Sequence, residues 1–344
     1  MSASARRHLL VTAVSTLIAL AFVEGVVLRG ALGLRGLADL SIIQRDLEIG
    51  WSIAPNARTW HAALDFGLWV QTDALGLRAP IDERRAASQR EGGQRILVLG
   101  DSFAFGWGVP DDRMFSSELE RQLAARGHYT VRTAGVPGYS TDQEYLLWRR
   151  LATQLRPAQV VLLLHRSDPP ANVQDAAVMG KFVYPKPRFQ IVEGRLQLSG
   201  VPVPDKRALA PDSVFEPVKR LLRPFATYAL VQSSLRSGVS LPWRASAPSP
   251  QQAPSPEAYE MTAALLGALD ADVRAHGATF FVALIPTDAA MTETLARICR
   301  TLGIPFLDLQ AAFNGQKDVL LVHDRHWNAK GHGIAARAVA PFVR

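Results

Sequence analysis

The 344-residue sequence contains one cysteine, Cys299, so no disulfide can form within the chain. Cys299 continues an apolar pattern with Leu295 and Leu302, which predicts that it lies in the core. The histidines near the C-terminus have no cysteine beside them, and Asp324 and His326 do not make the ligand set of a closed zinc site. We therefore expect neither a metal nor another cofactor.

The sequence also lacks a basic run with interleaved aromatic residues. Its 38 lysines and arginines outnumber 31 acidic residues, which gives a net charge of +7, but the arginines are scattered. Nucleic-acid-binding domains usually gather their basic residues on one face or along one helix. We therefore expect a solvated, arginine-rich surface and no nucleic-acid partner.

One long apolar run is present, over residues 9–28, and only a few polar residues, Glu24 among them, interrupt it. About 20 apolar residues span a bilayer as a helix, and the preceding Arg6 and Arg7 favour a cytoplasmic N-terminus. We predict a signal anchor over residues 1–33, a single pass through the cytoplasmic membrane, and the remaining chain on the periplasmic or extracellular side. The alternatives are a signal peptide cleaved near residues 19–21 and, less favoured, a buried helix of a cytosolic protein.

After residue 90, short apolar runs alternate with segments of helical periodicity. This alternation predicts an α/β fold with a doubly wound parallel sheet between two layers of helices. Strands are expected at residues 96–99, 129–133, 160–165, 279–285 and 305–309, and helices at 115–126, 141–154, 259–276, 292–302 and 329–343.

Two segments fall outside this alternation. Residues 34–90 contain short strand-like pieces, and we predict an extended arm that packs on the domain formed by residues 91–344. Residues 172–257 form an insertion with a hairpin signal at residues 189–198, a helical run at 218–235 interrupted by Pro224, and a Pro/Ser/Gln-rich linker at 246–256. A long insertion in a compact domain often has a role, so a lid-like subdomain and a passive decoration stay open as alternatives.

The strand at residues 96–99 runs into Gly100-Asp101-Ser102. A serine at the carboxyl end of a parallel strand lies where open α/β sheets bind ligands. It becomes a nucleophile if a base reaches it. The candidate base is His326, with Asp324 as its acid partner, and both lie just before the last predicted helix. Asp101 is expected to stabilise the turn and not to react.

The motifs Gly100-Asp101-Ser102-Phe103 and Asp324-x-His326-Trp327-Asn328 resemble the first and last blocks of the SGNH (GDSL-type) hydrolases. Further pieces, Leu75-Gly76-Leu77-Arg78 and Gly135-Val-Pro-Gly138, are similar to the membrane-anchored bacterial branch of that superfamily. The resemblance implies a three-layer, flavodoxin-like α/β/α fold and an ester-cleaving serine site.

The resemblance also implies roles for single residues. Ser102 is the expected nucleophile, His326 the general base and Asp324 the group that orients the imidazole. The Ser102 N–H and Gly135 are the expected oxyanion donors, and Ser167 stands where the family has an asparagine donor. Three alternatives stay open there: Ser167 donates directly or through a water, Asn172 replaces it, or the enzyme is slow, selective or degenerate.

The Asp324-x-His326-Trp327 form is similar to that of bacterial members that handle cell-envelope and exopolysaccharide esters. The resemblance therefore implies an exported serine esterase that removes O-acyl groups, with acetyl expected, from an envelope or secreted carbohydrate. Two other functions remain open. One is an O-acyltransferase that passes the same acyl group to a sugar hydroxyl, and the other is a degenerate domain that only binds glycan. The expected partners are an acylated carbohydrate or other small ester and, through the N-terminal helix, the membrane.

Overall fold

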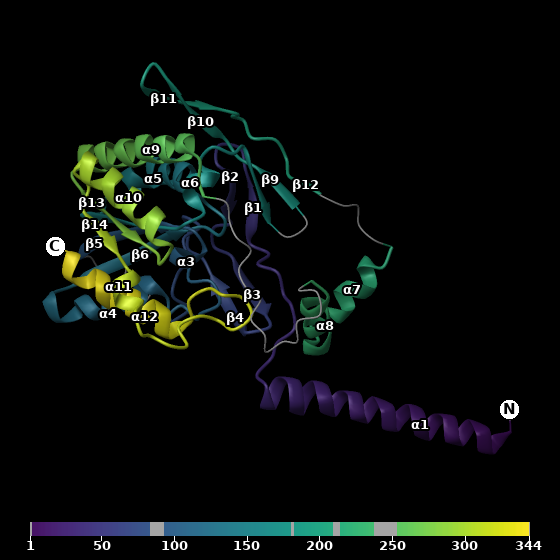
Figure 1. The fold of residues 1–344 in the computed structure, drawn as a ribbon. Coiled ribbons are helices and arrows are strands. Elements are labelled where there is room, and N and C mark those ends of the chain that lie inside the picture. The colour runs from purple at the N-terminus through teal and green to yellow at the C-terminus, as the bar shows by residue number, and fades with distance from the viewer. Residues whose placement is uncertain (1, 83–92, 180–181, 209–213, 237–252, 344) are drawn as a thin grey trace.

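The computed structural model describes residues 2–82, 93–179, 182–208, 214–236 and 253–343 (Figure 1). The predicted domain boundary at residues 90–91 and most of the predicted linker at 246–256 lie outside these ranges. Pro256, the last residue of that linker, opens a helix.

A five-stranded parallel sheet forms the centre of the fold, in the order β14-β13-β7-β5-β6. Its strands lie close to the predicted positions: β5 Gln94–Gly100, β6 Tyr129–Gly135, β7 Gln159–Leu164, β13 Thr279–Leu284 and β14 Phe306–Asp308. The chain adds β6 on one side of β5 and then β7 on the other. This reversal places the ligand-binding crevice of a doubly wound sheet next to the carboxyl end of β5.

Helices cover both faces of the sheet, as the α/β prediction requires. On β7, Val160, Leu162 and Leu164 belong to one buried cluster, whereas Val161 and Leu163 belong to the other. Alternate side chains of a strand point to opposite faces, so a fully apolar strand is buried on both sides. The first cluster contains α5 (Thr141–Leu155), α9 (Pro256–Ala275) and α10 (Ala289–Leu302), and the second contains α4 (Phe115–Leu123), α11 (Gln310–Phe313) and α12 (Ala329–Val339).

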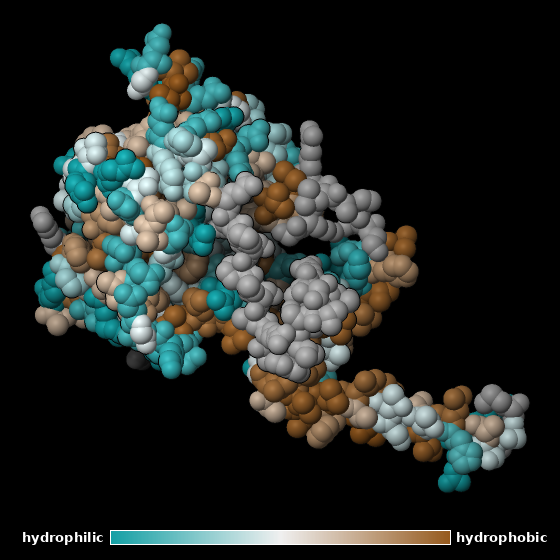
Figure 2. Space-filling model, in the orientation of Figure 1, coloured by the Kyte–Doolittle hydropathy of each residue, from teal (hydrophilic) through white to brown (hydrophobic). Residues whose placement is uncertain are grey.

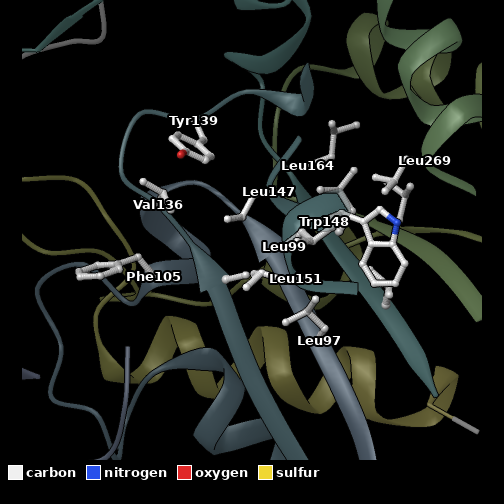
Figure 3. Close-up of a cluster of buried hydrophobic side chains, with 14 of the residues drawn as sticks. Leu97, Leu99, Phe105, Val136, Tyr139, Leu147, Trp148, Leu151, Leu164 and Leu269 are labelled. Atoms are coloured by element: carbon white, nitrogen blue, oxygen red, sulfur yellow. The ribbon is translucent and has the colours of Figure 1, made fainter. Parts of the chain in front are cut away.

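Figure 3 shows part of the first cluster. Leu97 and Leu99 of β5 lie beneath Leu147, Trp148 and Leu151 of α5, and all five side chains are buried. This packing holds α5 across the strand that ends at the candidate serine, so the serine stands on a rigid platform. Cys299 is buried in the same cluster, as predicted, and burial raises its pKa to about 12.

The ends of the helices differ from the predictions by a few residues, and capping accounts for several of the differences. Helix α10 begins at Ala289 because the Asp288 carboxylate accepts a hydrogen bond from the Met291 N–H at 3.0 Å. Likewise, Ser255 caps α9 and Pro256 occupies its first turn, a position where proline is well tolerated. At the other end of the chain, α12 stops at Val339, and the 3₁₀ turn Ala340–Phe342 with Pro341 follows.

The described part of the arm, residues 34–82, forms two antiparallel strand pairs. Strand β1 (Ile43–Asp46) pairs with β2 (Gly50–Ile53), and β3 (Arg58–Ala63) pairs with β4 (Phe66–Gln71). Trp51 is fully buried, and its indole N–H donates to the Pro137 carbonyl at 3.0 Å. The arm therefore fixes the loop that follows β6, at the crevice end of the sheet.

The insertion divides into two parts with different neighbours. Its first part contains a small sheet, β8 (Ala176–Met179), β9 (Phe182–Pro185) and β12 (Arg207–Ala208), and the predicted hairpin, β10 (Arg188–Val192) and β11 (Arg195–Ser199). Met179 of β8 lies against Gly138 in the loop after β6, and Phe189 of the hairpin packs on α9. This part lies at the crevice end of the sheet.

The second part of the insertion is helical. Pro224 separates α7 (Glu216–Leu222) from α8 (Ala226–Arg236), as the sequence predicts. Helix α8 packs against the end of the N-terminal helix, where Ala226 and Leu230 form a cluster with Leu28 and Leu34. Helix α8 is therefore packed on the N-terminal helix and not over the strand ends.

The N-terminal helix α1 (Ala3–Phe22) continues without a break into the π-helical segment η1 (Val23–Ala31). Figure 1 shows it projecting from the domain, and residues Ser4–Ala31 are long and apolar enough to cross a membrane. Only 6% of its most apolar 18-residue window is buried, so most of its apolar side chains, unlike Leu28, are not part of a protein core (Figure 2). A signal sequence would meet the same criteria of length and composition.

Candidate active site

Ser102 begins the short helix α3 (Ser102–Phe105) directly after β5. The Asp101 carboxylate caps this helix by accepting a hydrogen bond from the Phe103 N–H at 2.9 Å, which confirms the turn-stabilising role predicted for it. Gly106 ends the helix in the left-handed conformation at φ 79°. The sharp turn from strand to helix presents the serine at the crevice, and no described residue accepts a hydrogen bond from the Ser102 N–H.

Ser102, His326 and Asp324 lie together although the serine and histidine are 224 positions apart. The Ser102 Oγ is 2.7 Å from His326 Nε2, and His326 Nδ1 is hydrogen-bonded to Asp324 Oδ1. A hydroxyl, an imidazole and a carboxylate in this order can transfer the serine proton to the imidazole while the carboxylate fixes its tautomer. This arrangement is the one that the resemblance to the SGNH hydrolases predicts.

The loop that carries Asp324 and His326 is held by the turn between β3 and β4. The Asp65 carboxylate in that turn accepts the His323 N–H at 2.8 Å and the Asp324 N–H at 2.9 Å. At the far end of the loop, Asn328 caps α12 by accepting the N–H groups of Lys330 and Gly331. The arm therefore helps to position the acid.

Trp107 also contacts Asp324, and it is assigned no role in the sequence analysis. Its indole N–H donates to Asp324 Oδ2 at 3.1 Å, so both carboxylate oxygens of Asp324 are engaged. His61 of β3 packs edge-on against Trp107 with ring centroids 4.4 Å apart. Trp107 lies five positions after Ser102, but nothing in the sequence indicates that it reaches an aspartate 217 positions away.

The charge state of Asp324 follows from two opposing effects. Burial raises the pKa of its carboxyl, whereas the hydrogen bonds from His326 and Trp107 lower it. The net result is a pKa below the usual value, so Asp324 is ionised at neutral pH. An ionised carboxylate stabilises the imidazolium that forms when His326 takes a proton.

Aromatic rings enclose the histidine. Phe103 lies between His165 and His326, with centroid distances of 5.1 and 4.9 Å. Trp327, the neighbour of His326, is buried against Phe103 and is stacked on Phe313 at 5.3 Å. Trp327 thus anchors the loop to the core, and His326, which precedes it in the sequence, faces Ser102.

The backbone of α3 is held from behind by Arg78, in the Leu-Gly-Leu-Arg motif. The buried guanidinium donates to the carbonyls of Phe105 at 3.0 Å, Gly106 and Val109 at 2.6 Å. Cations near a helix C-terminus satisfy its free carbonyls. Burial lowers the pKa of Arg78 to about 10, so it stays charged at neutral pH and fixes the end of the nucleophile helix.

Gly135 is expected from the sequence to donate to the oxyanion, but in the structure it has another role. A Cβ on Gly135 would lie 2.1 Å from the Phe105 nitrogen. The missing side chain therefore allows the α3 backbone to approach β6, which is a sufficient reason for a glycine at this position. Its N–H donates to Thr133 Oγ1 at 3.2 Å. In the same loop, the Gly138 N–H has no acceptor among the described residues, and the φ of Gly138 is 82°. Gly138 is included in a motif in the sequence analysis but is assigned no role there as a donor.

Ser167 lies beside His165 at the end of β7. The Ser167 Oγ is 2.7 Å from His165 Nδ1, and the same nitrogen is 3.3 Å from Asp101 Oδ2. Burial lowers the pKa of His165, which therefore is neutral at pH 7. His165 thus connects Ser167 to the acid that caps α3.

Asn172 does not take the place of the missing donor. It is fully buried, its Oδ1 accepts the Asp142 N–H at 3.2 Å, and its Nδ2 donates to Thr262 Oγ1 at 3.0 Å. Asp142 also pairs with Lys186 of the insertion, and both side chains are buried. Asn172 is therefore part of the framework that ties the insertion, α5 and α9 together.

No protein-family model matches this chain, and no curated protein matches it. Among solved structures, the chain is similar to TesA (14% identity, TM-score 0.40), covering 72% of this chain and 97% of that one. It is also similar to the psychrotrophic esterase EstA from Pseudoalteromonas sp. (12%, 0.40, covering 72% and 96%) and to an acetyl xylan esterase (11%, 0.39, covering 73% and 100%). At these identities and scores the functional argument rests on the geometry of the site itself.

Proposed function

We propose that this protein is a serine esterase of the SGNH type that removes O-acyl groups from a carbohydrate outside the cytoplasmic membrane. The observation that carries the proposal is the contact of 2.7 Å between Ser102 Oγ and His326 Nε2, with Asp324 on the other imidazole nitrogen. A degenerate binding domain would need none of these contacts. The intact relay therefore favours catalysis.

In the proposed reaction, Ser102 Oγ attacks the ester carbonyl as its proton passes to His326 Nε2. The tetrahedral intermediate collapses, the C–O bond to the sugar oxygen breaks, and His326 returns the proton to that oxygen. A water then attacks the acyl-serine with His326 again as the base, which releases the carboxylic acid and restores Ser102.

The negative oxygen of the intermediate needs hydrogen-bond donors beside Ser102. The free Ser102 N–H at the start of α3 is the first donor of the proposal, with Gly135 and Ser167 as the further predicted ones. The hydrogen bond from Gly135 to Thr133 favours the unbonded Gly138 N–H as an additional donor. Loss of one donor typically costs about 10²–10³-fold in rate. We therefore expect a loss of that size in Ser167→Ala if Ser167 donates, measured as kcat with unchanged KM.

The proposed location rests on the helix Ser4–Ala31 and on Arg6 and Arg7 before it, which favour a cytoplasmic N-terminus. The proposed carbohydrate substrate rests on the similarity of the Asp324-x-His326-Trp327 motif to bacterial members that handle envelope and exopolysaccharide esters. Acetyl is the expected acyl group.

The decisive experiment labels the full chain, reconstituted in lipid nanodiscs, with a fluorophosphonate probe and measures acetate release from p-nitrophenyl acetate. Ser102→Ala and His326→Ala should lose both signals, whereas the exposed Ser199→Ala and His128→Ala should keep them. Failure of the folded wild type to react with the probe would refute the esterase. Addition of a deacetylated polysaccharide separates the transferase alternative, because acyl groups would then appear on the acceptor instead of as free acetate.

A further inference from the structure

Ser167 stands where the resemblance predicts an asparagine, and the two side chains donate hydrogen bonds differently. An asparagine amide holds its hydrogens in a fixed plane, whereas a serine hydroxyl has one hydrogen that rotates about the C–O bond. A rotating hydroxyl stabilises an oxyanion only if another group holds its oxygen and leaves its hydrogen free. The donor role of Ser167 in the proposed reaction therefore depends on what contacts its Oγ.

The group that holds Ser167 is His165. The Ser167 Oγ lies 2.7 Å from His165 Nδ1 and has no other hydrogen-bond partner among the described residues. Because burial lowers the pKa of His165, the ring is neutral at pH 7 and its single hydrogen is on either Nδ1 or Nε2. With the hydrogen on Nδ1, the ring donates to Ser167 and the hydroxyl hydrogen stays free. With the hydrogen on Nε2, the hydroxyl donates to the ring and has no hydrogen left for a substrate.

Asp101 favours the first of these two tautomers. Its Oδ1 accepts the Phe103 N–H at 2.9 Å, which fixes the orientation of the carboxylate. Its Oδ2 lies 3.3 Å from His165 Nδ1. A carboxylate oxygen repels the lone pair of an unprotonated nitrogen and attracts an N–H, and the effect is weakly screened because Asp101 is buried. The hydrogen is therefore more stable on Nδ1, and the described part of the chain offers Nε2 no hydrogen-bond acceptor.

His165 lies beside the nucleophile because β5 and β7 are neighbours in the sheet. The two strands pair in parallel, and Ser102 and His165 each lie two positions beyond the last pair, at the same edge. The His165 ring lies 5.1 Å from the Phe103 ring between centroids. Asp101 and Phe103, which flank Ser102 in the sequence, therefore both contact His165. Ser167 is thereby held at the edge of the sheet where the proposed intermediate forms.

We propose that Asp101 and His165 are positioning residues that make Ser167 an oxyanion donor. The inference rests on the proposed esterase, because it concerns the same site. The Asp101 carboxylate places the imidazole hydrogen on Nδ1, this N–H donates to the Ser167 Oγ, and the Ser167 hydroxyl donates to the negative oxygen of the intermediate. Both contacts of His165 are on one ring nitrogen, so the ring passes no proton between Asp101 and Ser167. Ser167 is then a donor and not a second nucleophile.

Asp101→Asn tests this series of contacts with almost no change in shape. The amide oxygen keeps the cap on the Phe103 N–H, because asparagine caps helices as well as aspartate does. The NH₂ group then faces His165 Nδ1 and moves the ring hydrogen to Nε2. We expect kcat for p-nitrophenyl acetate to fall about 10²–10³-fold, as in Ser167→Ala. The double variant of Asp101→Asn and Ser167→Ala should be no slower than Ser167→Ala alone, because both remove the same interaction.

Asp272→Asn is the matched control. The Asp272 Oδ1 also lies 3.3 Å from a histidine Nδ1, that of His276. This pair lies at the end of α9 that leads into the amino end of β13, which is the edge of the sheet opposite the crevice. The full chain with Asp272→Asn, reconstituted in nanodiscs like the other variants, should keep the wild-type kcat.

The tautomer is measured directly and without turnover. In the full chain labelled with nitrogen-15 histidine, long-range proton–nitrogen correlation spectra show which ring nitrogen carries the hydrogen, and the signal lost in His165→Gln is that of His165. We expect the hydrogen on Nδ1 in the wild type and on Nε2 in Asp101→Asn. A merely structural role of Asp101 would leave the tautomer unchanged.

Each other outcome overturns the inference. A wild-type His165 with its hydrogen on Nε2 would show that Asp101 does not set the tautomer, whether or not the chain is active. If Ser167→Ala keeps the wild-type kcat, Ser167 is not a donor, and the esterase stands without it. If the double variant is slower than Ser167→Ala, Asp101 acts by another route. Failure of the wild type to react with the fluorophosphonate probe would instead refute the esterase itself, and the inference with it.

Discussion

At the scale of single residues, the state of Asp324 depends on a tryptophan that no motif assigns to it. We predict that Trp107→Phe, which keeps the ring but removes the hydrogen bond to Asp324, lowers kcat/KM roughly 10-fold or more. Without that bond the pKa of Asp324 rises, so the pH range in which its carboxylate is ionised and can stabilise the imidazolium becomes narrower on the acid side. A pH–rate profile measures both effects.

Trp69→Phe is the matched control, because Trp69 is 46% exposed on β4 and no hydrogen bond of its indole N–H is described. Equal profiles for the two variants would show that the Trp107 bond does not tune the acid.

His332 of α12 predicts how stability depends on pH. Burial, together with Arg78 and His326, lowers its pKa from 6.5 to about 3, and neither ring nitrogen has a hydrogen-bond partner among the described residues. Between these values the unfolded chain binds a proton that the folded chain does not. The free energy of unfolding should therefore fall as pH drops from about 6.5 toward 3. A pKa shift of this size corresponds to a loss on the order of a few kcal/mol.

Chemical unfolding at several pH values checks this prediction. His332→Leu should flatten the acid side of the stability profile, while His128→Leu at an exposed position should leave the slope unchanged. The same slope in both variants would mean that other groups carry the acid sensitivity.

The residue scale also shows where sequence reasoning succeeds and where it does not. The motifs at Ser102, Asp324 and His326 identify the three groups that the fold brings together, because each side chain follows a local pattern. Gly135 illustrates the limit: a glycine in a motif indicates a close approach, but the sequence does not say whether a substrate or, as here, the backbone of α3 approaches.

At the scale of secondary-structure elements, the β3–β4 hairpin supports the candidate active site although it contributes none of Ser102, His326 and Asp324. Asp65→Ala removes the acceptor for two N–H groups of the catalytic loop, so we expect slower fluorophosphonate labelling and a loss of about 1–3 kcal/mol in stability. Asp65→Asn keeps an acceptor oxygen and should restore most of the labelling rate. Stopped-time labelling and chemical unfolding of both variants provide the comparison. A loss of the same size in Asp65→Asn would indicate that the charge matters and not the hydrogen bonds.

The core elements could be predicted because their apolar residues repeat with the period of the structure they form. Strand β7 is apolar at most of its positions and α10 repeats its apolar residues at helical spacing, so both lie within a few residues of the prediction. The arm strands have few such repeats. Their roles depend on contacts such as that from Asp65 to residues 258 and 259 positions away, which leave no local pattern.

At the scale of the whole molecule, the N-terminal helix is joined to the domain by side-chain contacts as well as by the chain. In the sequence Glu24 is a polar interruption that weakens the prediction of a membrane span. In the structure it is the cap of a helix more than 200 positions away. Such a long-range partner cannot be inferred from one sequence, so the two parts of the insertion could not be assigned to different neighbours.

We predict that Glu24→Ala releases the start of α8 in the full chain held in nanodiscs. Amide hydrogen exchange over residues 226–230 should become faster, because two N–H groups lose their acceptor. Exchange in α5 should not change. Thr16→Ala in the same helix serves as the control, since its hydroxyl bonds only to the carbonyl of Thr12. Unchanged exchange at α8 in Glu24→Ala would show that Leu28 and Leu34 suffice to hold it.

The distance in sequence between Ser102 and His326 has a consequence for biosynthesis. The ribosome adds the nucleophile early and the base 224 residues later, and the loop that holds the base must also reach Asp65 in the arm. A nascent chain that has emerged only as far as β13 can assemble most of the sheet but has no base beside its serine. The proposed hydrolytic site is therefore incomplete during synthesis, and we expect turnover only from a chain whose N-terminal arm has met the loop before the final helix.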